Sequence, residues 1–291
     1  MRTTWRPIAT VFILLITIAA FANYFASHPQ VRQLLRDTSP ILLLSLLGLY
    51  VLFVGSLALI NSATLRLCGT RLIGRESLLL TMYSSVINFF GPLQSGPAFR
   101  ALYLKKMHGT NLKSYGTATL VYYGFYAFFS GLFLVSGLLG WWLIPLAGAG
   151  LLILWLTYRS PFAFAERLRK LDLSGWYYLA AATFLQVSLL AIIYYVELRS
   201  VMPGIHFSQV IIYTGAANFA LFVSLTPGAI GFRESFLVFS EKLHHVSNNA
   251  IVVANTIDRA VYISLLLFLA VAIFATHAQK KLAVATADAE T

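Results

Sequence analysis

The chain is poor in charge. Of its 291 residues only 11% are Asp, Glu, Lys or Arg, whereas 59% are hydrophobic, and the mean hydropathy is +0.78. A water-soluble globule of this composition could not cover its surface with polar side chains. The composition therefore excludes a soluble domain and indicates an all-α integral membrane protein with several spans.

Cysteine and acidic side chains are also scarce. The single cysteine, Cys68, cannot form an intrachain disulfide, and neither it nor the six histidines follow a metal-ligand spacing such as CxxC or HExxH. There is no GxxxxGK[ST] loop for ATP. We therefore expect no cofactor, no metal and no nucleic-acid partner. The net charge of +11 is explained first by cytoplasmic loops rich in Lys and Arg, and second by an anionic substrate.

Long apolar runs are what the sequence does contain. A spanning helix needs about 20 apolar residues, and six runs qualify: 8–26, 40–60, 115–138, 139–157, 176–196 and 254–276. The first run resembles a signal peptide, with Ala20 and Ala22 placed like a cleavage site, but its length favours a retained helix. We expect one transmembrane domain over residues 1–276, followed by a cytoplasmic tail at 277–291, with no soluble catalytic domain.

Two regions, about 77–107 and 208–243, are interrupted by Gly and Pro and do not read as ordinary spans. If both enter and leave on one side and the N-terminus is cytoplasmic, 15 of the 21 basic residues lie inside. If both cross fully, eight of those residues move outside and the positive-inside rule fails. The charge distribution therefore predicts two re-entrant helical hairpins in an inner (plasma) membrane protein whose two termini are cytoplasmic.

The two hairpins resemble each other. The first reads "YSSVINFF" from Tyr83 and the second "YTGAANFA" from Tyr213, and each continues through a Gly/Pro tip to Phe-Arg, ending at Arg100 and at Arg233. Three spans lie between them, so they would enter from opposite sides as an inverted repeat. Such paired broken segments predict a midplane binding site, where helix N-termini and guanidinium groups favour an anion.

"FRALYLKKMHG", "LTPGAIGFRES" and "IDRAVYISLLL" together resemble the lysylphosphatidylglycerol synthase/flippase transmembrane family, over about residues 8–276. The resemblance implies a polytopic domain that moves lipids between leaflets. Some members carry a soluble aminoacyl-transferase domain; this chain lacks one, so lysyl transfer is not expected. The chain also departs from the family pattern, because Tyr122 and Tyr123 stand where a Glu-Arg pair is expected, whereas the second half keeps Asp258-Arg259.

Ionisable groups deep in a bilayer are costly and are usually paired or functional. We predict a gating or proton-coupling role for Glu234 and Asp258, with structural ion pairs as the alternative. Lys105 and Lys106 are predicted to gather anionic lipid at the surface. Ser95 and Thr226 are expected to cap broken helices. The predicted substrate-binding residues are Arg100, Arg233, Asn88, Asn218 and Arg259.

The function that these features favour is a flippase-like translocase for an anionic phospholipid or a polyprenyl-phosphate-linked lipid. Its partners would be membrane lipids, with a second copy of the chain or a lipid-biosynthesis enzyme as further candidates. The alternatives are an integral-membrane glycosyl- or phosphotransferase and an ion-coupled carrier of a small anion. The enzyme is less favoured, because there is no Asp-x-x-Asp pattern and few deep carboxylates to hold Mg²⁺ or act as acid and base.

Overall fold

The computed structural model describes residues 38–90, 95–139, 148–150, 173–223 and 232–289, together with single positions at 26, 29, 33, 36, 152, 156 and 159. Over these ranges the regular elements are helices, without strands. The spans expected at 8–26 and 139–157 lie almost wholly outside the described residues, as do most of the two Gly/Pro tips.

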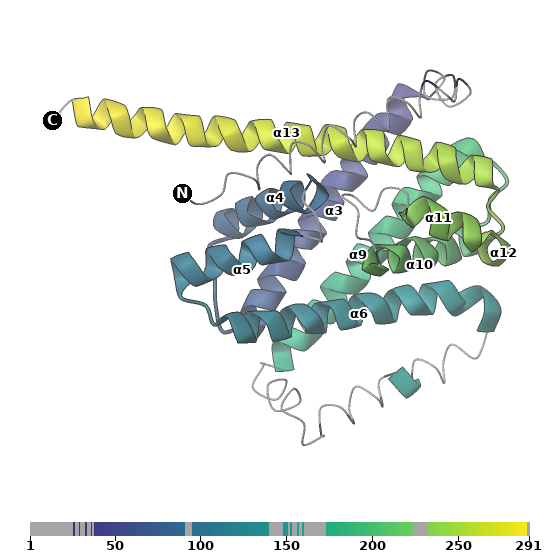
Figure 1. Ribbon diagram of the computed structural model, residues 1–291, viewed down its shortest axis with the longest axis horizontal. Coiled ribbons are helices and arrows are strands. Elements are labelled where there is room, and N and C mark those ends of the chain that lie inside the picture. The colour runs from purple at the N-terminus through teal and green to yellow at the C-terminus, as the bar shows by residue number, and fades with distance from the viewer. Residues whose placement is uncertain are drawn as a thin grey trace, which may run out of the picture.

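Four described helices are long and apolar enough to cross a membrane: α3 (Pro40–Leu67), α6 (Leu112–Leu139), α9 (Leu173–Val201) and α13 (Asn248–Ala289). Each contains an apolar stretch of at least 25 residues, more than the roughly 20 that a bilayer requires. They match four of the six expected spans. The protein is therefore a multi-pass membrane protein. Helix α13 continues to Ala289, so the segment expected as a tail begins as an extension of the last span (Figure 1).

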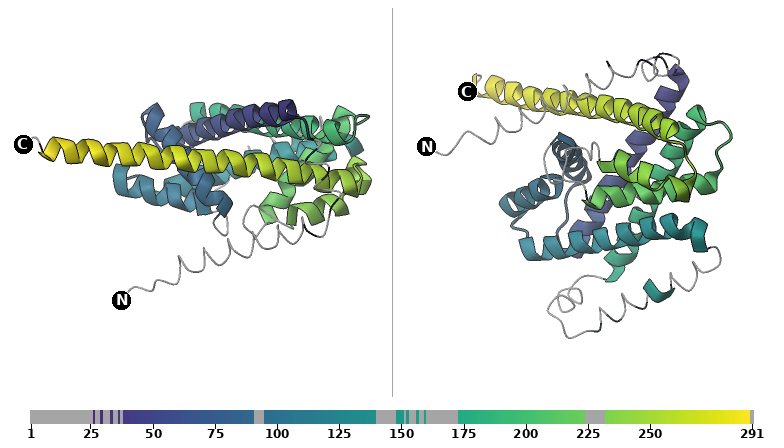
Figure 2. Two further views of the ribbon diagram at one scale, coloured as in Figure 1. Left: turned by 90° about the horizontal axis from the view of Figure 1, so that it is seen from above. Right: turned by 45° about the vertical axis from the view of Figure 1, so that its right-hand side comes forward.

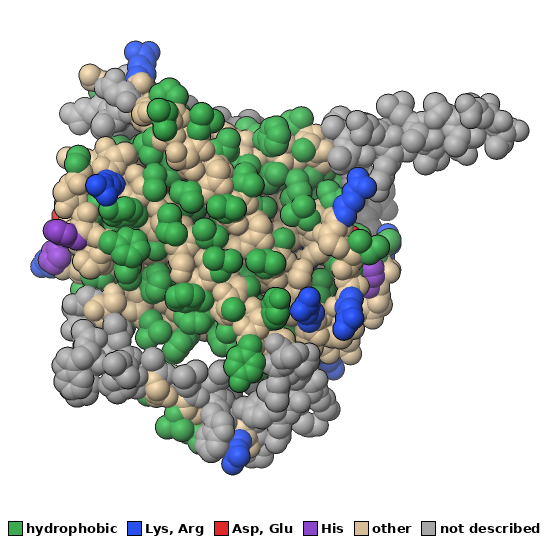
Figure 3. All heavy atoms as spheres, turned by 180° about the vertical axis from the view of Figure 1, so that it is seen from behind, with side chains coloured by type: hydrophobic (Ala, Val, Ile, Leu, Met, Phe, Trp, Pro, Cys, Tyr) green, Lys and Arg blue, Asp and Glu red, His purple; other side chains and the backbone are tan. Residues whose placement is uncertain are grey.

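The surface of the bundle is apolar where lipid would meet it. Figure 3 shows one face covered by hydrophobic side chains, with Lys and Arg confined to its edges. Large exposed side chains project from the long helices, including Leu44, Leu52, Phe184, Ile192 and Phe268. On a soluble protein such a continuous patch would be a binding or aggregation surface. On this chain it is the surface that the acyl chains cover.

Four shorter helices form in the two regions that are predicted to be re-entrant hairpins. They are α4 (Gly74–Phe90), α5 (Ser95–His108), α10 (Phe207–Val223) and α11 (Phe232–Phe239), and the one-turn α12 (Glu241–His244) follows them. At 8 to 17 residues each they are shorter than a spanning helix. α4 packs against α5, and α10 packs against α11. Both pairs lie between α13 and α6, with α4 and α5 toward one end and α10 and α11 toward the other (Figures 1 and 2).

The second pair is held by a very close helix contact. A Cβ added to Gly215 of α10 would lie 2.3 Å from the backbone nitrogen of Leu134 on α6. Only glycine allows two helix backbones to approach so closely, and small residues take this role between membrane helices. Asn218, one turn later, donates from Nδ2 to Ser130 Oγ of α6 at 3.1 Å. Packing and a hydrogen bond together fix α10 against α6.

One end of the bundle is strongly basic. The end of α3, the start of α4, the end of α5 and the start of α6 meet there, joined by a cluster of Leu65, Leu80, Leu104 and Tyr115 and by a hydrogen bond between Thr70 and Thr110 hydroxyls. The described Lys and Arg side chains on these segments are Arg66, Arg71, Arg75, Lys105, Lys106 and Lys113. The opposite end, around Ile205 and Val246, has Arg199 and Lys242.

Candidate functional site

A cavity of about 250 Å³ lies among the two helix pairs and the long helices. It draws lining residues from α3, α4, α5, α6, α9, α10, α11 and α13. Three arginines line it, Arg100 from α5, Arg233 from α11 and Arg259 from α13. These positions are far apart in the sequence, and the structure brings them to one space. The other polar lining residues are Thr81, Ser84, Ser85, Asn88, Gln186 and Asp258.

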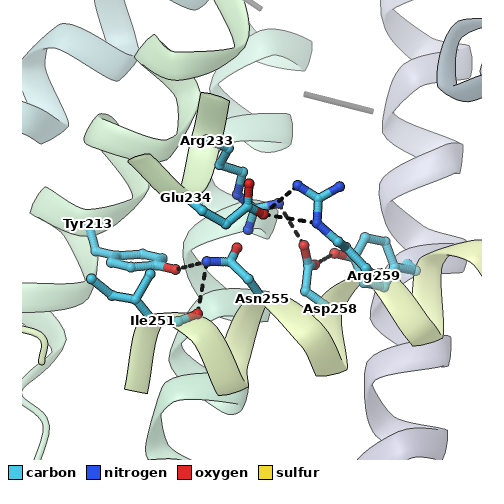
Figure 4. A network of polar contacts seen from close by, with 8 residues as sticks. Tyr213, Arg233, Glu234, Ile251, Asn255, Asp258 and Arg259 are labelled. Atoms are coloured by element: carbon cyan, nitrogen blue, oxygen red, sulfur yellow. Dashed lines mark hydrogen bonds and ion pairs between the residues drawn. The ribbon is translucent and has the colours of Figure 1, made fainter. Parts of the chain in front are cut away.

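Arg233 and Asp258 form a buried ion pair at one wall of the cavity (Figure 4). Arg233 NH1 donates to Asp258 Oδ2 at 2.6 Å, and the other carboxylate oxygen accepts from the hydroxyl of Tyr50 on α3. The guanidinium also lies over the ring of Tyr194 on α9, 4.9 Å from its centroid. Arg233 is 8% exposed and Asp258 3%, so a largely buried pair joins α11, α13 and α3.

A second ion pair lies beside the first. Arg259 Nε donates to Glu234 Oε1 at 3.0 Å, and Arg259 NH2 bonds to the same oxygen. Adjacent residues point about 100° apart on a helix, so Asp258 and Arg259 each reach a different neighbour on α11. The two pairs cross-link α11 to α13 (Figure 4). Figure 4 also shows Asn255 donating to the Tyr213 hydroxyl and to the Ile251 carbonyl, which extends the network to α10.

Several guanidinium donors at the cavity are unused. Nε and NH2 of Arg233, and Nε of Arg100, are buried without a hydrogen-bond partner in the described part of the chain. Arg100 has no carboxylate within ion-pair distance among the described residues, whereas Arg233 and Arg259 do. Buried donors are nearly always satisfied. Unused donors on two arginines that line one cavity therefore indicate a place for an acceptor-rich anion.

Asn88 positions the helix that carries Arg100. Its Oδ1 accepts from the backbone N–H of Gly96 at 3.2 Å, so it supplies a cap to the first turn of α5 from the neighbouring α4. Asn88 also lines the cavity. The Ser95 hydroxyl bonds instead to the Ile87 carbonyl, at 3.0 Å, which ties the two helices together rather than capping α5. α5 begins at Ser95, so Arg100 falls in its second turn.

The two repeat asparagines have different surroundings. Asn218, the counterpart of Asn88, is fully buried, bonds to Ser130 and is not among the cavity lining. The predicted capping residue Thr226 lies outside the described residues. Lys105 and Lys106 are exposed on the last turns of α5, at the basic end and away from the cavity lining.

Aromatic side chains form much of the remaining wall. Tyr122 and Tyr123, the residues at which the chain departs from the family pattern, both line the cavity, and Tyr122 donates to Gln186 Oε1 at 3.1 Å. The other aromatic lining residues are Tyr50, Phe53, Phe89, Tyr126, Tyr194 and Tyr262. All these rings present apolar faces, and the hydroxyls of the tyrosines can donate to or accept from a ligand. The site is therefore cationic at one wall and aromatic around it.

Sequence reasoning missed Glu197. It falls next to the last residue of the expected span 176–196, where a carboxylate would reach the membrane surface. In the structure α9 continues to Val201, and Glu197 is 1% exposed. Its Oε1 has no hydrogen-bond partner among the described residues. The spacing could have indicated this burial, because Glu197 follows Tyr194 by three residues and so lies on the same face of the helix.

A separate polar cluster joins α4 to α5 at the basic end of the bundle. Glu76 at the start of α4 accepts from the Tyr103 hydroxyl at 2.8 Å and contacts His108 Nε2 at 2.7 Å, both on α5. Burial raises the pKa of the Glu76 carboxyl, but the hydrogen bonds from His108 and Tyr103 and the charge of His108 outweigh it, so the pKa lies below its usual value. Among the described residues no group of three His, Cys, Asp or Glu side chains could hold a metal.

The comparison with known proteins agrees with this architecture. The chain matches the family model described as the lysylphosphatidylglycerol synthase TM region over residues 8–271, which covers three of the four described spans, the fourth as far as residue 271, and all the cavity arginines. No curated protein matches it. The chain belongs to the family of lysylphosphatidylglycerol synthase transmembrane regions, which associates it with a function in membrane lipids.

Proposed function

We propose that the protein is a flippase-like translocase that moves a lipid with an anionic headgroup between leaflets, and that the cavity binds the headgroup. The observation that carries the proposal is the set of unused guanidinium donors on Arg100 and Arg233 beside this cavity. Arg259 and Asn88 would complete the headgroup site. Asn218 would act indirectly, by fixing α10 against α6.

The charge of the cavity favours an anion. Arg233 and Arg259 are each balanced by a carboxylate, whereas Arg100 has no such partner among the described residues. The guanidinium of Arg100 therefore leaves the lining with a surplus positive charge. A phosphate diester carries one negative charge and several acceptor oxygens, and arginine binds such groups through parallel hydrogen bonds. The unused donors and the surplus charge point to the same ligand chemistry.

The size of the cavity suits a headgroup rather than a whole lipid. Pockets for small ligands run from about 300 to 1,000 Å³, and this one is about 250 Å³. A lipid translocase needs only the polar headgroup to leave the bilayer surface, because the acyl chains remain in hydrocarbon throughout. The exposed apolar surface of the long helices (Figure 3) is suited to lie against those chains.

The arrangement of the short helices supports re-entrant hairpins related by inversion. α4 and α5 lie toward the basic end and α10 and α11 toward the other, and both pairs contribute lining residues to one cavity. The positive-inside rule would place the basic end of the bundle in the cytoplasm. The first hairpin would then enter from the cytoplasm and the second from outside, and each would carry an arginine to the middle of the membrane. Both termini would be cytoplasmic.

The surroundings of the carboxylates argue against the enzyme alternative. Asp258 and Glu234, the two deep carboxylates that the sequence identified, both bond to arginines. A general base or a Mg²⁺ ligand needs a carboxylate that faces the reacting group. A carrier of a small soluble anion would use the same arginine chemistry, so the test below includes it.

The experiment compares purified wild type with Arg100→Gln in liposomes. The assay follows the leaflet exchange of headgroup-labelled phosphatidylglycerol, with labelled phosphatidylcholine and the efflux of inorganic phosphate as the other arms. Loss of one charge-assisted hydrogen bond costs about 1.5–3 kcal/mol, so Arg100→Gln should weaken headgroup binding roughly 10- to 100-fold. Arg75→Gln, at an exposed arginine on α4, is the matched control and should behave as wild type. Phosphate efflux without lipid exchange would favour the soluble-anion carrier.

A further inference from the structure

Glu197 is a buried carboxyl to which neither the fold nor the cavity assigns a role. It lies on α9, 1% exposed, next to Leu198, which belongs to the same core as Tyr194 and Tyr213. Oε1 is buried without a hydrogen-bond partner among the described residues. An ionised carboxylate in such a place is strongly disfavoured, so the form that fits this position is the neutral acid, which carries a proton.

Arg233 is the cation whose charge acts on Glu197. The Arg233 guanidinium lies over the ring of Tyr194, 4.9 Å from its centroid, and Glu197 is one helical turn beyond Tyr194 on the same face of α9. The charges of Arg233 and Glu197 interact. Arg233 uses NH1 for Asp258 and leaves Nε and NH2 unused. The guanidinium of Arg233 thus bonds to one carboxylate, keeps two unused donors, and interacts by charge with a carboxyl whose Oε1 has no partner among the described residues.

The other titratable groups around this core do not compete for the role. Tyr194 on α9 and Tyr213 on α10 interact with Glu197, but both are neutral phenols. From α6, Tyr126 faces Arg233 and Tyr194. From α3 and α13, the hydroxyl of Tyr50 and the carboxylate of Asp258 bond to each other.

The charged groups on α11 and the histidine on α12 also have partners of their own. On α11, Glu234 bonds to Arg259 of α13. On α12, the ring of His244 contacts the ring of Tyr213, and its Nε2 lies 3.0 Å from the Leu237 carbonyl. Arg233 is therefore the cation through which the ionisation of Glu197 would act.

We propose that Glu197 is a proton-binding site that becomes a second partner of Arg233, beside Asp258, when it loses its proton. While Glu197 holds its proton, Arg233 bonds to Asp258 and presents Nε and NH2 to the headgroup. When the proton passes to water, the new carboxylate takes those two donors and the headgroup loses them. The consequence for the ligand rests on the proposed function: headgroup binding should weaken as the pH rises.

The first test needs no lipid substrate. A protonated carboxylic acid has an infrared carbonyl band that is distinct from the bands of carboxylates and amides. Purified wild type at neutral pH should show this band, and Glu197→Gln should lose it. In Asp258→Asn, Arg233 has lost its carboxylate partner and should bond to the ionised form of Glu197. The Glu197 band should therefore disappear at a lower pH in Asp258→Asn than in wild type. The variant Asp258→Asn, Glu197→Gln shows which part of the band in Asp258→Asn belongs to Glu197.

The outcomes decide the proposal separately from the transport claim. A wild-type band that Glu197→Gln leaves unchanged would overturn it, as would a Glu197 band that Asp258→Asn does not shift. If Glu197→Gln fails to fold, Arg233→Gln supplies the second measurement. Without the positive charge of Arg233, Glu197 should keep its proton, and its band, to a higher pH than in wild type. In the liposome assay, leaflet exchange of phosphatidylglycerol should fall as the pH rises in wild type but not in Glu197→Gln. Absence of exchange at every pH refutes the proposed function and leaves the infrared result standing.

Discussion

Replacing Arg233 with Gln should destabilise the protein far more than replacing Arg100 with Gln. Arg233 bonds to Asp258 at 2.6 Å, and both side chains are buried. Removing one partner of a buried ion pair leaves an uncompensated charge and costs about 3–5 kcal/mol. Arg100 has no carboxylate partner among the described residues, so Arg100→Gln should cost less than about 1 kcal/mol, as at an unpaired position.

The assay is reversible unfolding in mixed micelles, with the free energy of unfolding measured for both variants, for Asp258→Asn and for Arg233→Gln, Asp258→Asn. The double variant has no unpaired charge and should lose less than the sum of the single losses, by about 1–3 kcal/mol. Asp258→Asn should be the milder single variant, because Arg233 can turn to Glu197. Equal losses for Arg100→Gln and Arg233→Gln, or strictly additive losses in the cycle, would refute the assignment of Arg233 to a buried pair and of Arg100 to the ligand.

Substitutions at Gly215, Asn88 and Glu76 test the helix contacts that support the site. Gly215→Ala places a Cβ 2.3 Å from the Leu134 nitrogen and should lower the free energy of unfolding by about 1–3 kcal/mol. The control Gly116→Ala meets nothing within 4 Å and should stabilise α6 by about 0.5–1 kcal/mol. Equal effects of the two variants would contradict the close contact. Asn88→Ala should cost about 1 kcal/mol through the lost cap of α5, and Asn88→Asp, which keeps the acceptor, should cost less. The pKa of Glu76 is lower in the folded state than its usual value. Wild type should therefore be more stable than Glu76→Gln above the usual glutamate pKa, and this difference should vanish as the pH falls through the lowered pKa. A difference that does not change with pH would contradict the hydrogen bonds of Glu76.

The spans and the short helices could be predicted from sequence because each depends on a local pattern. The length of an apolar run and the positions of Gly and Pro determine where a helix can cross a membrane and where it must break. The helices α3, α6 and α9 begin or end up to seven residues from the expected bounds, as at Leu67 of α3, because polar residues at a helix end can be buried by other helices. A hydropathy pattern contains no information on that burial.

The partners of the charged residues could not be predicted, because they come from elements far apart in the chain. The sequence indicated that Asp258 and Arg259 need separate partners, but not that these are Arg233 and Glu234. It treated Asn88 and Asn218 as equivalent, whereas one caps α5 beside the cavity and the other bonds to α6. Glu197 escaped notice because its burial depends on the helices packed against the end of α9.

Leaflet exchange of headgroup-labelled phosphatidylglycerol in liposomes is the most direct test of the central claim, that the arginine-lined cavity binds and moves an anionic lipid headgroup. The account predicts exchange by wild type and by Arg75→Gln, and exchange reduced at least about tenfold by Arg100→Gln at a subsaturating lipid concentration, with its folding intact. Exchange that is equal in wild type and Arg100→Gln, or absent from wild type, would contradict it.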